Sequence, residues 1–182
     1  QERLSRQIVD ALRLRLTPTE DRRLAQRPIG DLRAYEYYLL ARQEIWSSNT
    51  QSLDHALQLV RRAEEIVGDN ELLFVAEGLI YWQHVNVGIV PVSQYDEYLR
   101  KAEGCAAKVF ALNPESSKGH GLRGAIRHNR ADPNGAARDY KKALVLDPND
   151  PEALLWLGYH YAVSGRPDLA RGQPDAEQAR LV

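Results

Sequence analysis

One tripeptide pattern recurs at a fixed interval, and this interval limits what the chain can fold into more than any other feature. Leu112-Asn113-Pro114 returns as Leu146-Asp147-Pro148, 34 positions later, and each copy closes an apolar run with helical spacing. Self-similarity at roughly 20 to 50 residues is typical of stacked repeats, in which each unit is one supersecondary motif. We therefore expect a repeat array.

A helix-turn-helix unit is predicted directly after the second copy. Asp150, Pro151 and Glu152 provide an N-cap, a proline at the first helical position and an acid in the first turn, which all stabilise a helix start. The residues that follow place apolar and small side chains at helical spacing, then a turn and the start of a second helix: Leu154, Leu157, Gly158, Tyr161, Gly165, Pro167 and Ala170.

The same pattern divides the chain into about three to four helical hairpins preceded by two leading helices, an all-α fold. The leading helices take residues 1–30, and the hairpins take about residues 31–68, 69–113, 114–148 and 149–182. The last hairpin is expected to be incomplete, because Gly172 and Pro174 interrupt its second helix. Ser93-Gln94-Tyr95-Asp96 is predicted to be a capping box that opens the second helix of the hairpin 69–113.

These residues resemble the tetratricopeptide repeat (TPR) family, whose unit has the same length as the interval described above. The unit that ends the hairpin 114–148 matches the small, aromatic and proline positions of that family with Gly124, Ala136, Tyr140, Ala143 and Pro148. The resemblance implies an α-α superhelix, a solenoid whose first helices line a concave face. It departs where His120, Arg123 and Arg127 replace large apolar groups, so we expect that helix to be shorter or more exposed.

A second resemblance concerns the segment before the array. Residues 16–20, 22–25, 27–28 and 34–39 are similar to the junction between a TolB-like region and C-terminal TPR repeats in bacterial multidomain regulators. Such regulators often begin with a class III adenylate or guanylate cyclase, a protein kinase or a winged-helix domain. Because the chain contains no methionine, even at position 1, we expect it to be a fragment of such a signalling protein. No cyclase or kinase motif occurs in it.

Composition excludes several classes of partner. Lys plus Arg number 24 and Asp plus Glu number 25, so the chain lacks the basic surplus expected of a nucleic-acid or anionic-membrane binder. No apolar run approaches the roughly 20 residues that span a bilayer. The single cysteine, Cys105, cannot form an intramolecular disulfide. We expect a cytoplasmic chain with neither nucleic acid nor membrane as its partner.

The sequence shows no constellation of catalytic, metal-binding or cofactor-binding residues. Its five histidines lack ligand spacing: His120 and His128, eight positions apart on one predicted helix, would lie about 11 Å apart, too far for one zinc ion. Cys105 lies in the middle of a predicted helix, where a buried spacer is favoured over a reactive thiol. Gly119, Gly121 and Gly124 lack the preceding strand of a phosphate-binding loop. We predict no enzyme activity, no metal and no cofactor.

The remaining feature is the predicted concave face, whose slots carry aromatic and aliphatic side chains suited to a peptide or protein partner. For Tyr38, Trp46 and Trp82, core packing between hairpins is the alternative. The leading hypothesis is a non-catalytic interaction and scaffold module that binds a peptide or an effector domain. The alternative is a homodimerising module that sets the dimeric state of an attached cyclase-like effector. The candidate groove residues are Tyr38, Arg42, Val75, Leu79, Trp82, His128, Asn129, Leu155 and Tyr159.

Overall fold

The computed structural model describes residues 28–47 and 49–163, and in them every regular element is a helix, which confirms the all-α prediction. The predicted leading helices and the second helix of the last hairpin fall almost wholly in residues 1–27 and 164–182, outside the described part. The elements are α3 (Leu32–Ile45), α4 (Thr50–Val67), α5 (Glu71–Asn86), a short 3-10 helix (Val92–Gln94), α6 (Tyr95–Leu112), α7 (Ser117–Asn129), α8 (Pro133–Leu146) and α9 (Pro151–Val163).

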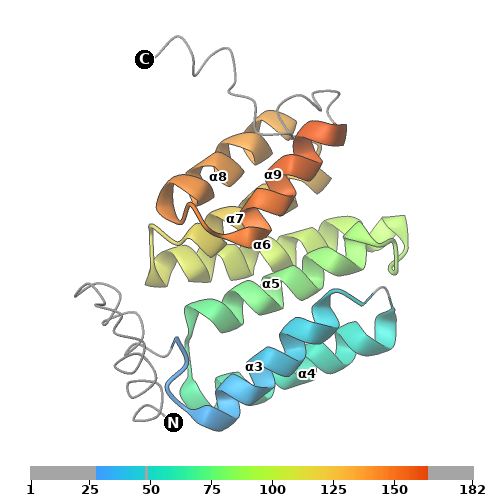
Figure 1. Ribbon diagram of the computed structural model, residues 1–182. Helices are drawn as coiled ribbons and strands as arrows, with labels where there is room; N and C mark the ends of the chain where they lie inside the picture. The colour runs from blue at the N-terminus through green and yellow to red at the C-terminus, as the bar shows by residue number, and fades with distance from the viewer. Residues whose placement is uncertain (1–27, 48, 164–182) are drawn as a thin grey trace, which may run out of the picture.

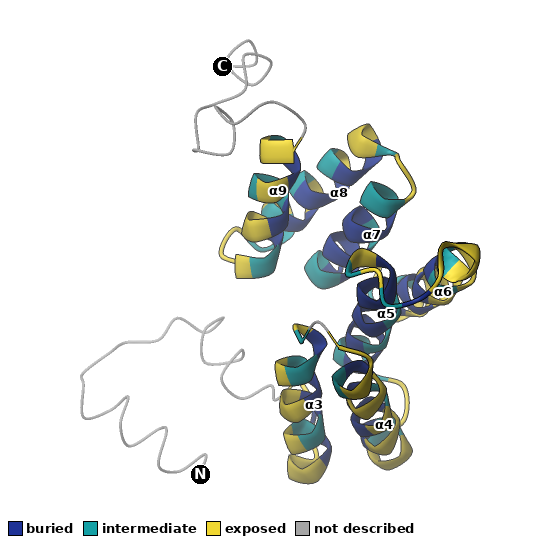
Figure 2. Cartoon of the chain, turned by 90° about the vertical axis from the view of Figure 1, so that its right-hand side faces the viewer, coloured by how far each residue is buried: buried dark blue, intermediate teal, exposed yellow. Residues whose placement is uncertain are grey.

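The helices pair into antiparallel hairpins that stack one upon another (Figure 1). The first hairpin is α3 with α4, the second α5 with α6 and the third α7 with α8, and α9 packs on the third. The stack is joined at α5 and α7: α5 packs on both α3 and α4 of the first hairpin, and α7 packs on both α5 and α6 of the second. Figure 2 shows α3 and α9 on one side of the stack, opposite α4 and α6. No described helix is long and apolar enough to cross a membrane.

Most helices begin at a side chain that caps their free backbone N–H groups, as the sequence predicts for α9. Asp150 Oδ1 accepts from the N–H groups of Glu152 (3.0 Å) and Ala153 (3.3 Å) at the start of α9. Each cap satisfies donors that have no partner inside the helix. The same arrangement occurs at the starts of α3, α4, α5, α7 and α8, with caps from Asp31, Asn49, Asn70, Ser116 and Asp132.

The capping box predicted for α6 is wrong. Gln94, the residue before α6, already has helical backbone angles (φ −100°, ψ −7°), and α6 has no side-chain cap. The 3-10 turn that follows Pro91 runs directly into the helix, so no extended residue is present to act as an N-cap.

A close approach joins the second and third hairpins. A Cβ atom on Gly78 of α5 would lie 2.5 Å from Leu122 Cδ2 of α7, closer than a carbon contact allows. Glycine therefore lets α5 and α7 pack closely along the row of first helices.

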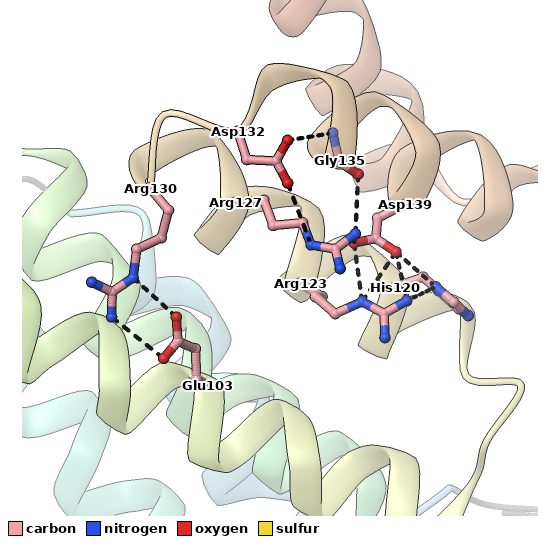
Figure 3. Close-up of polar contacts among 8 residues, drawn as sticks. All are labelled: Glu103, His120, Arg123, Arg127, Arg130, Asp132, Gly135 and Asp139. Atoms are coloured by element: carbon pink, nitrogen blue, oxygen red, sulfur yellow. Dashed lines mark hydrogen bonds and ion pairs between the residues drawn. The ribbon is translucent and has the colours of Figure 1, made fainter.

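Helix α7 was expected to be shorter or more exposed. With 13 residues it is shorter than α3, α4, α5, α6 and α8, which have 14 to 18, but its His120 is buried. Asp139 of α8, only 3% exposed, lies between Arg123 (Nη2–Oδ1 2.6 Å), Arg127 (Nη1–Oδ2 2.8 Å) and His120 (Nδ1–Oδ1 3.2 Å), as Figure 3 shows. A buried carboxylate is tolerated when it is paired in this way. Burial lowers the pKa of His120, and the hydrogen bond with Asp139 opposes that effect.

Candidate interaction surface

Four of the nine predicted groove residues belong to the hydrophobic core. Tyr38 is 7% exposed, Val75 3%, Leu79 0% and Trp82 6%. Side chains this buried have no free surface for a peptide, because neighbouring hairpins already cover them. Val75 and Leu79 are therefore core residues and not groove residues. Tyr38 and Trp82 are also core residues, as the alternative of packing between hairpins predicts.

The indole of Trp82 is held by the neighbouring hairpin. Its Nε1–H donates to the carbonyl oxygen of Ala125 (3.0 Å) and to Oδ1 of Asn129 (2.8 Å), both on α7. A buried indole N–H needs such an acceptor. Asn129, another predicted groove residue, is thus half-buried and engaged in tying the second hairpin to the third.

Side chains of α3 and α9 meet across the stack, although 110 positions separate them in the chain. Arg42 of α3, a predicted groove residue, forms an ion pair with Glu152 in the first turn of α9. Burial by itself lowers the pKa of Arg42. Glu152 and the hydroxyl of Tyr38 together raise the pKa by more than burial lowers it, so the net shift is upward. The guanidinium is held in its charged form by these partners.

Trp156 of α9 lies at the centre of an aromatic cluster to which three hairpins contribute side chains. Its ring centroid is 6.4 Å from that of Trp46 at the end of α3, 5.9 Å from that of Trp82 on α5 and 6.0 Å from that of Tyr140 on α8. Gly121 of α7 leaves room for the ring, because a Cβ there would lie 3.1 Å from Trp156 Cζ3. Trp156 is 8% exposed as a result. We call Trp46, Trp82 and Trp156 the tryptophan cluster.

Two predicted groove residues, Leu155 and Tyr159, are well exposed at the surface. Leu155 is 65% and Tyr159 58% exposed, and their spacing of four places them on one face of α9. His128 of α7 is half-buried and packs edge to face against Tyr159, with ring centroids 5.8 Å apart. We call Leu155, Tyr159 and His128 the α9 patch.

Exposed apolar side chains are concentrated on two helices. Of the twelve large hydrophobic residues exposed in the described part of the chain, eight lie on α3, its C-cap or α9. Isolated exposed apolar residues are ordinary, but concentration on particular elements is typical of contact surfaces. Five of the eight were not among the residues expected in the groove: Leu32, Leu39, Leu40, Leu154 and Val163. The other three are Trp46, Leu155 and Tyr159. A seven-residue spacing of Leu32, Leu39 and Trp46 was the available signal.

Comparison with protein families gives one match: residues 132–165, which include α8 and α9, match the model of the TPR repeat. No curated protein is similar enough in sequence to match the chain.

Comparison with solved structures finds TPR proteins. A thermophilic TPR protein of Thermus thermophilus has 21% identity and a TM-score of 0.64, with 82% of this chain and 73% of that chain covered. The first TPR of Spaghetti (RPAP3), bound to the HSP90 peptide SRMEEVD, has 18% identity and a TM-score of 0.51, with 77% and 99% covered. The second TPR domain of human RPAP3 has 18% identity and a TM-score of 0.45, with 70% and 97% covered. The first two similarities confirm the predicted fold, a TPR-like helical solenoid.

Proposed function

We propose that the chain is a non-catalytic protein-interaction module that binds a peptide or an effector domain, with the α9 patch as its point of contact. The observation that carries this proposal is the exposure of Leu155 and Tyr159, 65% and 58%, one helical turn apart. Tyrosine is enriched among residues that dominate binding energy, and apolar neighbours at a spacing of four match the side chains of an extended or helical peptide.

The contact surface differs from the groove expected from the sequence. The middle of that groove, Val75 and Leu79, lies in the core, so recognition begins on α9 and not on α5. His128 supplies a polar ring at the edge of the patch. A peptide as partner is supported by the Spaghetti TPR, which has a similar fold and is described as bound to a peptide.

The proposed setting is a cytoplasmic bacterial regulator with a TolB-like region and an effector such as a class III cyclase. The support for it is the resemblance of residues 16–39 to the junction in those proteins.

The test begins with peptides selected by phage display against the folded chain, whose affinities are measured by calorimetry. Replacement of both Leu155 and Tyr159 by alanine should weaken binding by about tenfold or more, the loss expected when central anchors are truncated. Val145→Ala is the matched control, since Val145 is 73% exposed on α8, away from the patch. Equal affinity of the double variant and the control, with unchanged circular dichroism, would count against the proposal.

Self-association is the second candidate function. It is favoured by α9, which exposes Leu154, Leu155, Tyr159 and Val163, each more than half exposed. Exposed apolar side chains that gather on one element are typical of contact surfaces. Analytical ultracentrifugation at micromolar concentration decides this point, because a strict monomer removes the candidate.

A further inference from the structure

We propose that the tryptophan cluster and the Arg42–Glu152 ion pair form a latch that holds the first hairpin against α9 and closes the inner side of the solenoid. The gating role of this latch rests on the proposed function, whereas the existence of the latch does not. When the latch opens, Arg42 and the part of the Trp82 ring that packs on Trp156 become available to a partner, while the indole N–H stays bonded to α7.

The latch joins units that are not neighbours in the stack. In a solenoid each repeat contacts only the repeats beside it, so its curvature follows from successive small rotations. Contact between the first hairpin and α9 bypasses the second and third hairpins. Helices α3 and α9 do not pack along their lengths. The contact is instead made by a few side chains: Arg42 and Trp46 near the end of α3, and Glu152 and Trp156 in the first turns of α9.

The contact combines charge with aromatic packing. The side chains of Arg42 and Glu152 are 28% and 14% exposed, so the pair is screened by solvent much less than a surface pair. Beneath it, Trp156 touches the rings of both Trp46 and Trp82 at centroid distances that favour aromatic attraction. A small set of side chains can therefore hold two elements that the backbone leaves apart.

The residues of the latch are also residues of the predicted groove. Arg42 and Trp82 were expected to face a partner, but in this state Arg42 faces Glu152 and the Trp82 ring faces Trp156. A partner that needs these side chains must compete with the latch. Its apparent affinity is then reduced by the fraction of molecules that are closed, and opening the latch removes this reduction.

Tryptophan fluorescence observes the latch selectively, because Trp46, Trp82 and Trp156 are the three tryptophans of the whole chain. Glu152→Arg places two cations opposite each other and should open the latch. We expect a red shift of tryptophan emission and stronger quenching by acrylamide, with helicity unchanged. Arg42→Glu should act in the same direction. The double exchange, Arg42→Glu with Glu152→Arg, restores opposite charges and should return both signals toward the wild-type values.

A distance measurement provides the second readout. Spin labels on cysteines at Gln43 of α3 and Leu154 of α9, both exposed, report the separation of the two helices in the full chain. The separation should increase in Glu152→Arg and return in the double exchange. If emission and separation stay at wild-type values in Glu152→Arg, the latch is refuted. It is equally refuted if the double exchange fails to restore them, because the charges then act only on local folding.

The link to binding is tested last, with the peptides selected against the chain. Glu152→Arg should bind them about 5- to 150-fold more tightly, the range of ordinary coupling between sites, and the double exchange should reverse the gain. Opening of the helices without any gain in affinity refutes the gating role and leaves the binding function standing. A chain that binds no selected peptide refutes the proposed function, and the fluorescence and distance results still decide the latch.

Discussion

Gly124 of α7 faces the ring of Tyr140 of α8 so closely that a Cβ atom on residue 124 would lie 2.5 Å from Tyr140 Cε1. Tyr140 is 3% exposed and its ring also contacts Trp156, so it has little freedom to move away. The third hairpin therefore depends on glycine at this position, where the TPR-like pattern also has one.

Gly124→Ala is predicted to lower the free energy of unfolding, because overpacking costs about 1–3 kcal/mol while the gain in helix propensity is at most about 1 kcal/mol. Gly104→Ala is the control. A Cβ on Gly104, inside α6, would meet no atom within 4 Å, so this variant should be about 0.5–1 kcal/mol more stable than wild type. Urea denaturation measures both, and equal stability of the two variants would contradict the packing argument.

Asp139→Asn is predicted to destabilise the protein by about 1–3 kcal/mol, because two arginines lose the buried negative charge that they share and one of its two acceptor oxygens is replaced by an N–H donor group. The loss stays below that of a fully buried pair, since the side chains of Arg123 and Arg127 are 37% and 36% exposed and can be hydrated. Thermal or urea unfolding checks the value.

Glu103→Gln is the matched control for the loss of an arginine partner. Glu103 binds Arg130 near the same hairpin (Figure 3), but its side chain is 46% exposed, so the change should cost about 0.5 kcal/mol or less. A loss of similar size in both variants would show that burial of Asp139 is not what gives its ion pairs their weight.

Glu64 of α4 is predicted to make stability depend on pH. Burial, and then the charge of Glu77, raise the pKa of Glu64 above its usual value of 4.5, and its buried Oε1 finds no hydrogen-bond partner among the described residues. The folded protein thus binds this proton more tightly than the unfolded chain does. Its contribution to stability is present below pH 4.5 and is lost as the pH rises through the raised pKa.

Glu64→Gln removes that loss, so the variant should gain stability relative to wild type as the pH rises from acid to neutral. Glu65→Gln, on an exposed neighbour in the same helix, should follow the wild-type curve. Urea midpoints measured across this pH range give the comparison. A difference between Glu64→Gln and wild type that does not change with pH would rule out Glu64 as the titrating group.

Cys105 is predicted to be unreactive in the folded protein. It is 4% exposed, its thiol donates to Glu77 (3.3 Å), and burial followed by the charge of Glu77 raises its pKa well above the usual range. Because thiolate is the reactive form, Ellman's reagent at mildly alkaline pH should label the chain only after guanidinium chloride is added. Rapid labelling of the native protein would show that α6 opens locally.

The local pattern was sufficient to place most helices. The helix starts at Asp31, Asn70 and Asp150 depend on side chains next to the helix they cap, so the sequence contains the whole interaction. The start of α6 was predicted incorrectly because the 3-10 turn after Pro91 runs directly into the helix, which then has no side-chain cap. The polar residues of α7 were expected to be exposed because nothing on α7 itself pairs with them. Their buried partner, Asp139, lies on the next helix.

The candidate groove residues differ in exposure. Leu155 and Tyr159 lie at the surface of α9 as a groove residue must, whereas Val75 and Leu79 occupy equivalent slots on α5 and are buried. Equivalent slots differ because α5 packs between the first hairpin and α7, while the described helices that pack along α9 are α7 and α8 alone. A repeat pattern assigns the same role to each copy and contains no information on its position in the stack.

The sequence by itself determined that the chain forms helices, where most of them begin, and that the start of α7 at Ser117 recurs 34 residues later as the start of α9 at Pro151. These properties depend on neighbours a few residues apart, which share a helix face or a cap. Only the tertiary structure decided that Arg42 meets Glu152 and that Trp156 meets Trp46. Those contacts depend on the curvature accumulated over three hairpins, where a small rotation at each interface moves the ends by many ångströms, and no local pattern encodes that sum.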